Sequence, residues 1–335
     1  MRESEKTIND QQIKDLIEHN KFSEAAKRLI ECQKETWPTL ELGYKSLNDI
    51  KTNIIQYDGF KFVIQFNPGR YTSSSALVDQ KSINDRQCFL CRENLPKEQE
   101  GIIINDYILL ANPFPIFQEH FTISNLKHKD QRIITSFSDL LQFSKLLSRH
   151  YTVFYNGPQC GASAPDHLHF QAGSRNEMPI EEEYGIIKNK SGEVLSEKAG
   201  CKIYSINDGL RKIIAIEGKQ ADNVQDLFNS FYKKYSSYSD YEEPLMNIIC
   251  LYEVEKGWKV LIMLRAKHRP EVFYKEGEEK ILFSPGACDY GGLCITPLEN
   301  DFNRINNMML KSIFNEVSLS DIKFQSLKQE LKSII

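Results

Sequence analysis

The sequence predicts an α+β protein made of two units, each with antiparallel strands flanked by helices. Residues 50 to 67 alternate apolar and polar side chains around Asp58-Gly59, which is typical of a β-hairpin. Helix-like and strand-like segments follow one another along the chain, and the second half repeats the style of the first. At 335 residues the chain also exceeds the usual domain size of roughly 100 to 200 residues. Two similar α+β units are the simplest account.

The composition is that of a folded, soluble chain. Hydrophobic residues make up 41% and charged residues 26% of the sequence. The formal net charge of -4 provides no broad cationic field for gripping a nucleic-acid backbone. We therefore expect no nucleic-acid partner, and any phosphate-binding site must be local.

The sequence shows no sign of a membrane or an oxidising compartment. Its charged beginning carries no apolar signal-peptide core, and no later apolar run is long enough to span a bilayer. The eight cysteines stand mostly alone inside apolar stretches, which favours reduced, buried thiols over disulfides. We expect a cytoplasmic protein with no membrane partner.

In the first half, the patterns predict a helical start followed by sheet-forming segments. Asn20 separates two short amphipathic helices, and Asn105-Asp106 marks the turn of a second hairpin. The predicted elements are two helices within 8 to 35, the hairpin at 50 to 67, strands at 102 to 104, 107 to 111 and 121 to 123, a helix at about 131 to 149 and a strand at 151 to 155.

In the second half, the patterns predict strands, one long helix and a helical end. The elements are strands at about 201 to 206, 211 to 216, 246 to 254, 258 to 265 and 292 to 297, and helices at about 222 to 235, 299 to 314 and 319 to 334, the last capped by Ser318 or Ser320. The predicted domains are a helical extension (1–48), a catalytic half (49–175), an exposed, polar crossover (176–200) and a second, pseudo-duplicated half (201–335).

The segment Asp166 to Gln171 has the strongest chemical signal. On a strand, His167, His169 and Gln171 project from one face, while Leu168 and Phe170 point into the opposite, apolar side. A neutral imidazole is a good nucleophile toward phosphorus, and a neighbouring amide can hold a phosphate oxygen. A bare pair of strand histidines also fits side chains satisfied by water or by core hydrogen bonds.

The surrounding residues favour the chemical interpretation. Gly161-Ala162-Ser163-Ala164-Pro165-Asp166-His167-Leu168-His169-Phe170-Gln171 resembles the G-x-S-x-P-H-x-H-x-Q signature of the transferase branch of the histidine-triad superfamily. That branch includes galactose-1-phosphate uridylyltransferase, diadenosine tetraphosphate phosphorylase and GDP-hexose phosphorylases. The resemblance implies two histidine-triad-like units, with His169 as nucleophile, Gln171 as stabiliser of a nucleotidyl-histidine and Ser163 as a phosphate holder. Asp166 is an extra residue relative to the shorter P-H-x-H form.

The resemblance extends loosely from about 50 to 302 and implies further ligand-binding residues. The stretch Asn112 to Ile123 is similar to the superfamily's nucleotide-cradling strands, which places Asn112 and Phe114 near the nucleotide. Phe114 also fits a core position. Segments 265 to 270 and 284 to 287 resemble parts of the phosphorylases. The candidate nucleotide- and phosphate-binding residues are Asn112, Phe114, Asn156, Arg70, Lys267 and Arg269, although each basic residue alone also fits a solvated surface charge.

Cys88-x-x-Cys91 has the spacing of half a structural zinc site. A redox dithiol is the alternative, but the residues that follow lack the helix-entry setting of a thioredoxin-like motif. The resemblance to the uridylyltransferases implies His128 and His167 as the remaining ligands, with His120 as the alternative to His128. A metal bound to His167 would hold the catalytic strand in place.

The function predicted from these residues is nucleotidyl transfer. A nucleoside monophosphate would move from a nucleotide sugar or nucleoside polyphosphate, through a covalent intermediate on His169, to a phosphate or sugar-phosphate acceptor. The alternatives are a hydrolase of the same superfamily and a non-catalytic nucleotide-binding module. Base, sugar, acceptor and direction stay open, and so does a homodimer, since related enzymes often dimerise.

Overall fold

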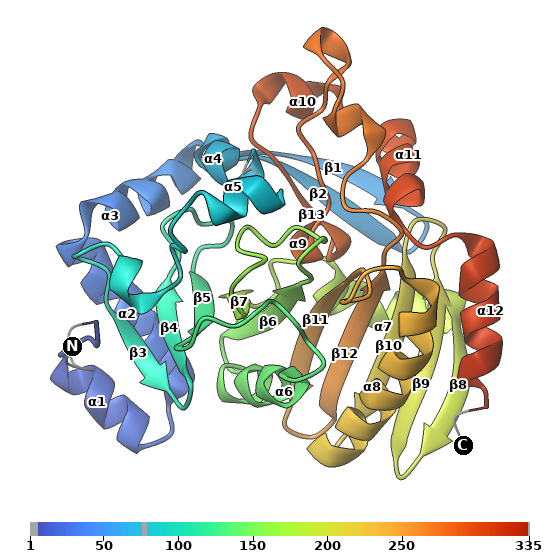
Figure 1. Cartoon of the computed structure of the whole chain (residues 1–335), viewed down its shortest axis with the longest axis horizontal. Helices are drawn as coiled ribbons and strands as arrows, with labels where there is room; N and C mark the ends of the chain where they lie inside the picture. The colour runs from blue at the N-terminus through green and yellow to red at the C-terminus, as the bar shows by residue number, and fades with distance from the viewer. Residues whose placement is uncertain (1–5, 76–78, 334–335) are drawn as a thin grey trace.

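The protein is organised around one ten-stranded antiparallel sheet (Figure 1). The computed structural model describes residues 6–75 and 79–333. The strand order is β3 (Gly101–Ile104), β4 (Tyr107–Ala111), β5 (His120–Asn125), β7 (His169–Ser174), β6 (Tyr151–Asn156), β11 (Met246–Glu253), β12 (Gly257–Leu264), β10 (Lys212–Gly218), β9 (Cys201–Asn207) and β8 (Gly192–Lys198). The first five strands come from the first half of the chain and the last five from the second. The pairing of β6 with β11 joins them, and the predicted α+β class is confirmed.

A small second sheet ties the two halves together. The hairpin of β1 (Lys51–Tyr57) and β2 (Phe60–Phe66) turns at the predicted Asp58-Gly59. Strand β13 (Leu293–Thr296), from the end of the second half, lies parallel to β2. The predicted strand at 292 to 297 therefore exists, but it extends the first-half hairpin instead of the large sheet.

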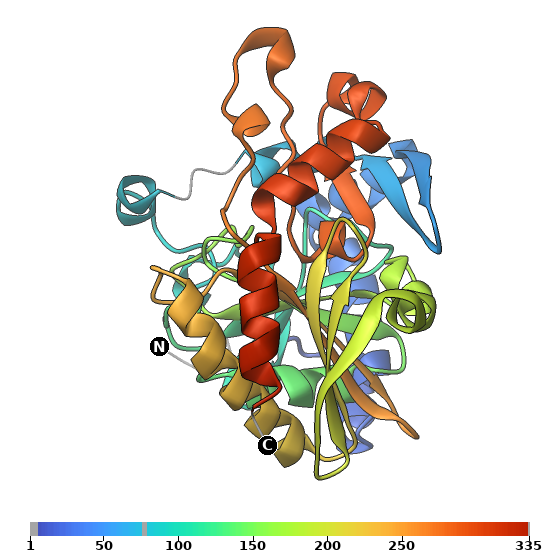
Figure 2. The same cartoon turned by 90° about the vertical axis from the view of Figure 1, so that its right-hand side faces the viewer.

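Helices cover both faces of the large sheet (Figure 2). One face packs against α1 (Gln11–Glu18), α2 (Phe22–Thr36), α6 (Phe137–Leu146), α8 (Ala221–Tyr235) and α12 (Asp321–Leu331). The other face carries the small sheet with α7 (Ile180–Ser191), α9 (Ala287–Tyr290) and α11 (Asn307–Val317). Shorter helices are α3 (Pro38–Lys45), α4 (Tyr71–Ser74), α5 (Gln80–Asn84) and α10 (Glu299–Arg304). Leu168 and Phe170 point to the first face, so His169 and Gln171 project from the second.

Three predicted elements differ in the structure. The helix expected from 131 begins only at Phe137, after a loop. The helix expected at 299 to 314 is divided at Ile305, because the Asn306 side chain accepts a hydrogen bond from the Met309 N–H and starts α11 anew. The crossover at 176–200 is not simply exposed, since it forms α7 and β8.

The composition of the crossover explains why its structure was missed. Helix α7 buries a single stripe, Ile180, Tyr184 and Ile187, and most of the remaining positions are polar. A polar segment with a narrow apolar stripe is easily mistaken for a loop. The division into domains stays a proposal. Within the described ranges, no helix is long and apolar enough to cross a membrane.

Candidate active site and metal centre

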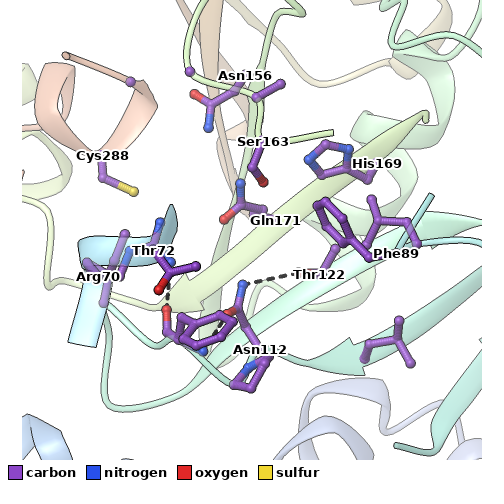
Figure 3. Close-up of a pocket in the computed structure, with 18 of the residues that line it drawn as sticks. Arg70, Thr72, Phe89, Asn112, Thr122, Asn156, Ser163, His169, Gln171 and Cys288 are labelled. Carbon is purple, nitrogen blue, oxygen red and sulfur yellow. Dashed lines mark hydrogen bonds between the residues drawn. The ribbon is translucent and has the colours of Figure 1, made fainter. Parts of the chain in front are cut away.

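The predicted motif lines a cavity of about 820 Å³ between the two halves. Side chains from β7, from the loop before it, from the small sheet and from second-half loops surround it (Figure 3). The sequence-predicted residues at its wall are Arg70, Asn112, Phe114, Asn156, Ser163, His169, Gln171 and Arg269. Tertiary structure therefore gathers the candidate residues of both halves around one space, large enough for a small-molecule ligand.

His169 is held as a neutral imidazole with one nitrogen free. The residue is 3% exposed and opens strand β7. Its Nδ1–H donates to the His167 carbonyl at 2.8 Å, which leaves the Nε2 lone pair for the cavity. Burial lowers the pKa of His169 to about 4. Near neutral pH this side chain is unprotonated, the form in which an imidazole can act as a nucleophile.

Gln131, a residue that the sequence analysis did not single out, fixes the backbone of His169. Its Oε1 accepts from the His169 N–H at 2.8 Å, and its Nε2 donates to the His169 carbonyl at 3.0 Å. The same Nε2 donates to the Asn156 carbonyl at 2.9 Å. The sequence analysis missed this role because it predicts a helix from 131. Gln131 instead lies in the loop before the helix, and from there its side chain reaches the backbone of two neighbouring strands.

The Gln171 amide has one defined orientation. His120 accepts the Ile116 N–H at Nδ1 (3.2 Å), so its Nε2 carries the proton and donates to Gln171 Oε1 at 2.9 Å. Burial, with the nearby Arg70 charge as a smaller cause, lowers the pKa of His120 to about 3 and keeps its ring neutral. The Gln171 oxygen is occupied, and its NH₂ group is the part left for a ligand in the cavity.

Asn156 is anchored in the same manner at the end of β6, the strand next to β7, and lies above Ser163 and Gln171 in Figure 3. Its Oδ1 accepts from Asn247 Nδ2 at 2.7 Å and from the Ala287 N–H at 2.8 Å. The Nδ2 group therefore remains available to the cavity. Two amide donors with fixed orientation, one on β6 and one on β7 beside His169, suit the non-bridging oxygens of a phosphate.

The motif loop carries Ser163 against the second half of the protein. Gly161 has a φ of +96°, and a Cβ at this position would lie 3.3 Å from the Gly286 Cα. Only glycine combines this backbone conformation with so close an approach. The loop thereby places Ser163 at the cavity wall together with Gly286.

Asn112 and Phe114 form the opposite wall. Asn112 Oδ1 accepts from the Phe114 N–H at 2.9 Å, and its Nδ2 donates to Thr122 Oγ1 at 3.2 Å. Asn112 thus shapes the turn, while the Phe114 ring is 39% exposed and faces the cavity. The core position considered for Phe114 is wrong.

Of the three predicted cations, two line the cavity and one does not. Arg70 donates to the Phe114 carbonyl at 2.7 Å, and the Arg269 guanidinium lies 4.2 Å from the centre of the Phe273 ring. The prediction for Lys267 is wrong. Its ammonium pairs with Glu316 and lies outside the cavity, whereas the next two residues, His268 and Arg269, line the cavity.

Cys88, Cys91, His128 and His167 form a cluster whose ligand atoms all lie within 4.8 Å of one another. The distance from Cys88 Sγ to His167 Nδ1 is 3.3 Å, and that from Cys91 Sγ to His128 Nδ1 is 3.2 Å. A tetrahedral zinc site, with its usual bond lengths, separates sulfur and nitrogen by about 3.6 Å. The cluster has the size and donor set of such a site.

The tautomer of His167 also fits a metal ligand. Its Nε2–H donates to the Asn125 carbonyl at 2.8 Å, so the Nδ1 lone pair points toward the two thiols. His120 is hydrogen-bonded to Gln171 and is not part of this cluster, so His128 is the third member. His167 does not share a strand face with His169 as predicted, because β7 begins only at His169 and the preceding residues turn.

Three further residues at the cavity were not singled out from the sequence. Phe89 lies between the two cysteines, is 45% exposed and lines the cavity beside His169 (Figure 3). The Arg86 guanidinium lies 5.0 Å from the centre of the Phe89 ring and pairs with Asp166 at 2.7 Å. The extra residue of the motif, Asp166, therefore links the cysteine loop to the histidine loop. Cys288 closes the far side.

Two family models match the chain in succession. Residues 29–174 match the "Domain of unknown function (DUF4922)", and residues 186–335 match the "GDPGP1-like, C-terminal domain". The curated yeast protein diadenosine 5′,5‴-P1,P4-tetraphosphate phosphorylase 2, from Saccharomyces cerevisiae, is 29% identical over 140 residues. That match spans 38% of this chain and 41% of the relative.

Solved structures share the fold across nearly the whole chain. Yeast Ap4A phosphorylase Apa2 in complex with AMP superposes with a TM-score of 0.57 at 16% identity, covering 88% of this chain and 96% of that one. A second Apa2 structure gives 0.57 at 14% identity, covering 84% and 97%. The two family models therefore match successive parts of the chain, and the chain shares its fold with Apa2.

Proposed function

We propose that this protein is a nucleotidyltransferase or phosphorylase that works through a covalent nucleotidyl-His169 intermediate. The observation that carries the proposal is the free Nε2 lone pair of a buried, neutral His169 facing a cavity between two anchored amide donors. A nucleophile with fixed donors for the phosphate oxygens provides the positioning on which phosphoryl transfer depends.

The reaction consists of two displacements at the α-phosphorus. His169 Nε2 attacks, an N–P bond forms, and the bond to the bridging oxygen breaks and releases a phosphate or sugar phosphate. The Nδ1–H···O=C bond to His167 stabilises the positive charge that the ring gains. An acceptor phosphate oxygen then attacks phosphorus, the N–P bond breaks, and the lone pair returns to Nε2. Ping-pong kinetics are expected.

The cluster of Cys88, Cys91, His128 and His167 is the proposed site of a structural zinc ion. All four protein donors are used in such a site, so the metal has no open position for substrate. Its contribution would be to hold the loop before β7. The carbonyl of His167 that orients the His169 ring would thereby be held as well.

The lining of the cavity supports a nucleotide donor and a phosphate-bearing acceptor. The exposed rings of Phe89 and Phe114 offer apolar surfaces to a base, and Arg70 and Arg269 offer positive charge to phosphates. We propose a nucleotide sugar or a dinucleoside polyphosphate as donor, with inorganic phosphate or a sugar phosphate as acceptor. A cytoplasmic location is part of the same proposal.

Mass spectrometry of the intact enzyme tests the covalent step. The enzyme is incubated without acceptor with nucleotide sugars, dinucleoside polyphosphates and nucleoside triphosphates, and then digested. We expect the mass of one nucleoside monophosphate on the peptide that contains His169, discharged when phosphate or a sugar phosphate is added. Nucleotide binding without any adduct would favour the non-catalytic alternative and contradict the proposal.

The Gln171 amide favours transfer over hydrolysis. It cannot exchange a proton with water, as a third histidine at this place can, so it should stabilise the intermediate without assisting its hydrolysis. Product formation is therefore expected to require added phosphate acceptor. Release of the nucleoside monophosphate at the same rate without acceptor would instead identify a hydrolase.

The orientation of Gln171 provides a prediction for His120. His120→Leu removes the donor to Gln171 Oε1, so the amide can turn its oxygen toward the phosphate, and we expect about a tenfold loss of kcat. His120→Gln can both accept from the Ile116 N–H and donate to Gln171, and should retain most activity. Steady-state kinetics on both variants, with Tyr44→Phe as a control for loss of packing near His120, provide the measurement. Equal losses in the two His120 variants would contradict the orientation argument.

A further inference from the structure

Arg265 is a buried cation directly behind the cavity wall. The residue follows β12, is 2% exposed, and does not line the cavity itself. Its Nη1 donates to Asn247 Oδ1 at 2.7 Å and to the Pro285 carbonyl at 2.6 Å. Its Nη2 donates to the carbonyls of Lys267 at 3.1 Å and His268 at 2.8 Å. All these partners are neutral oxygens.

No carboxylate in the described part of the chain forms an ion pair with Arg265. Its Nε has no hydrogen-bond partner there, and the ring of Tyr290, 5.1 Å away, is the remaining contact for its charge. Asp289 feels the charge of Arg265, but it uses its oxygens to accept the Gly286 N–H at 2.7 Å and the Ile295 N–H at 2.9 Å. A buried charge without a counterion is strongly unfavourable.

The other fully buried arginine among the described residues has a carboxylate partner. Arg211 is 0% exposed, and its Nε pairs with the Asp208 carboxylate at 2.6 Å. The same chain therefore neutralises one buried guanidinium with an acid and leaves the second with neutral oxygens. The two arginines differ in their position, because the hydrogen-bond partners of Arg265 connect it to the cavity.

A chain of oriented amides connects Arg265 to the cavity. The guanidinium binds Asn247 Oδ1, Asn247 Nδ2 donates to Asn156 Oδ1, and Asn156 Nδ2 is left to the cavity. Each link points its N–H away from the cation, so the dipoles align and each polarises the next. The N–H at the end of such a chain is a stronger donor to an anion than an isolated amide.

We propose that Arg265 is a positioning residue that completes the anion-binding site through Asn247 and Asn156, and that the phosphate of a bound nucleotide is its missing counterion. The proposal rests on the proposed function, since it presupposes a phosphorylated ligand beside His169. It gives the second half of the protein a role in the chemistry of the first. Phosphate recognition then depends on a charge that never touches the substrate.

Asn247→Asp is the decisive variant because it nearly preserves shape and supplies the missing carboxylate. The introduced carboxylate neutralises Arg265, and it cannot donate to Asn156, whose amide must turn its oxygen toward the cavity. Arg265→Met removes the charge and Arg265→Lys retains it. Asp208→Asn is the matched control, because it leaves the other buried arginine uncompensated away from the cavity.

The measurement compares the affinities of nucleosides with those of their 5′-monophosphates, for the four common bases, by calorimetry. In wild type we expect the monophosphates to bind more tightly, and this ratio should fall about tenfold or more in Asn247→Asp and Arg265→Met. Arg265→Lys should stay within about threefold of the wild-type ratio, and Asp208→Asn should lower the melting temperature without changing the ratio.

The outcomes separate the two proposals. If wild type binds nucleosides and monophosphates equally, the proposed function fails. If wild type prefers monophosphates but Asn247→Asp keeps the full preference, the role of Arg265 is overturned. Equal losses in Arg265→Lys and Arg265→Met would likewise indicate a purely structural residue and overturn the inference.

Discussion

Replacing His169 by alanine is expected to lower nucleotidyl transfer on the order of 10⁴-fold or more, the largest effect of any single substitution in this chain. The imidazole of His169 lies beside both Gln171 and Asn156 at the cavity (Figure 3). Removing a nucleophile abolishes the covalent route, and what remains is transfer assisted only by binding and oriented donors. The adduct on the active-site peptide should disappear with the activity.

Nucleotide affinity should survive this substitution. The amide groups of Asn156 and Gln171 are anchored by partners other than His169, so the binding site remains. Equilibrium binding of nucleoside monophosphates to His169→Ala should stay within about threefold of wild type. His19→Ala, a change at an exposed histidine of the first helix region, is the matched control and should leave transfer unchanged. Substantial transfer by a folded His169→Ala protein would refute the covalent mechanism.

Loss of the metal is expected to have the second-largest effect. Cys91→Ser removes a thiolate from the four-residue cluster, and we expect the protein to lose its bound zinc and to lose activity by about 100-fold. His167 would no longer be held from its Nδ1 side, and its carbonyl orients the His169 ring. Metal analysis of the purified protein should find about one zinc per wild-type chain and little in the variant.

The control for this experiment is another cysteine. Cys32 lies outside the cluster and donates to Asp10, so Cys32→Ser should retain both zinc and activity. Adding zinc to chelator-treated wild type should restore activity, while the same addition to Cys91→Ser should not. Full activity in metal-free wild type would contradict the proposed role of the cluster, and a disulfide between Cys88 and Cys91 would favour the redox alternative.

Local patterns were sufficient for the parts of this protein that depend on neighbouring residues. The hairpin at Asp58-Gly59 and the turn at Asn105 follow from alternation and turn chemistry, and the structure contains both. The same holds for the candidate nucleophile, because His169 and Gln171 lie two residues apart on one strand and necessarily share a face. The spacing of Cys88 and Cys91 likewise indicates that the two thiols bind one metal ion.

Sequence periodicity gave the wrong structure for polar side chains whose partners lie far away in the sequence. His167 was predicted on the strand face of His169, but the turn at Asp166 directs its ring to the cysteines, and Asp166 itself is held by Arg86. Gln131 was predicted inside a helix, yet its amide bridges the backbones of Asn156 and His169. Such hydrogen bonds join positions 25 to 38 residues apart and leave no periodic trace in the sequence.

The sequence by itself determined the α+β class, the shared strand face of His169 and Gln171, and the pairing of Cys88 with Cys91, because each depends on residue type and short spacing. The resemblance to a known family added the role of His169 and the metal ligands His128 and His167. Only the tertiary structure decided which nitrogen of His169 is free, which way the amides of Gln171 and Asn156 point, and that Lys267 is outside the cavity. The two amide orientations depend on long-range contacts with His120 and Asn247, and the ammonium of Lys267 pairs with the distant Glu316. A buried polar group takes its orientation from its partners, and folding alone brings those partners together.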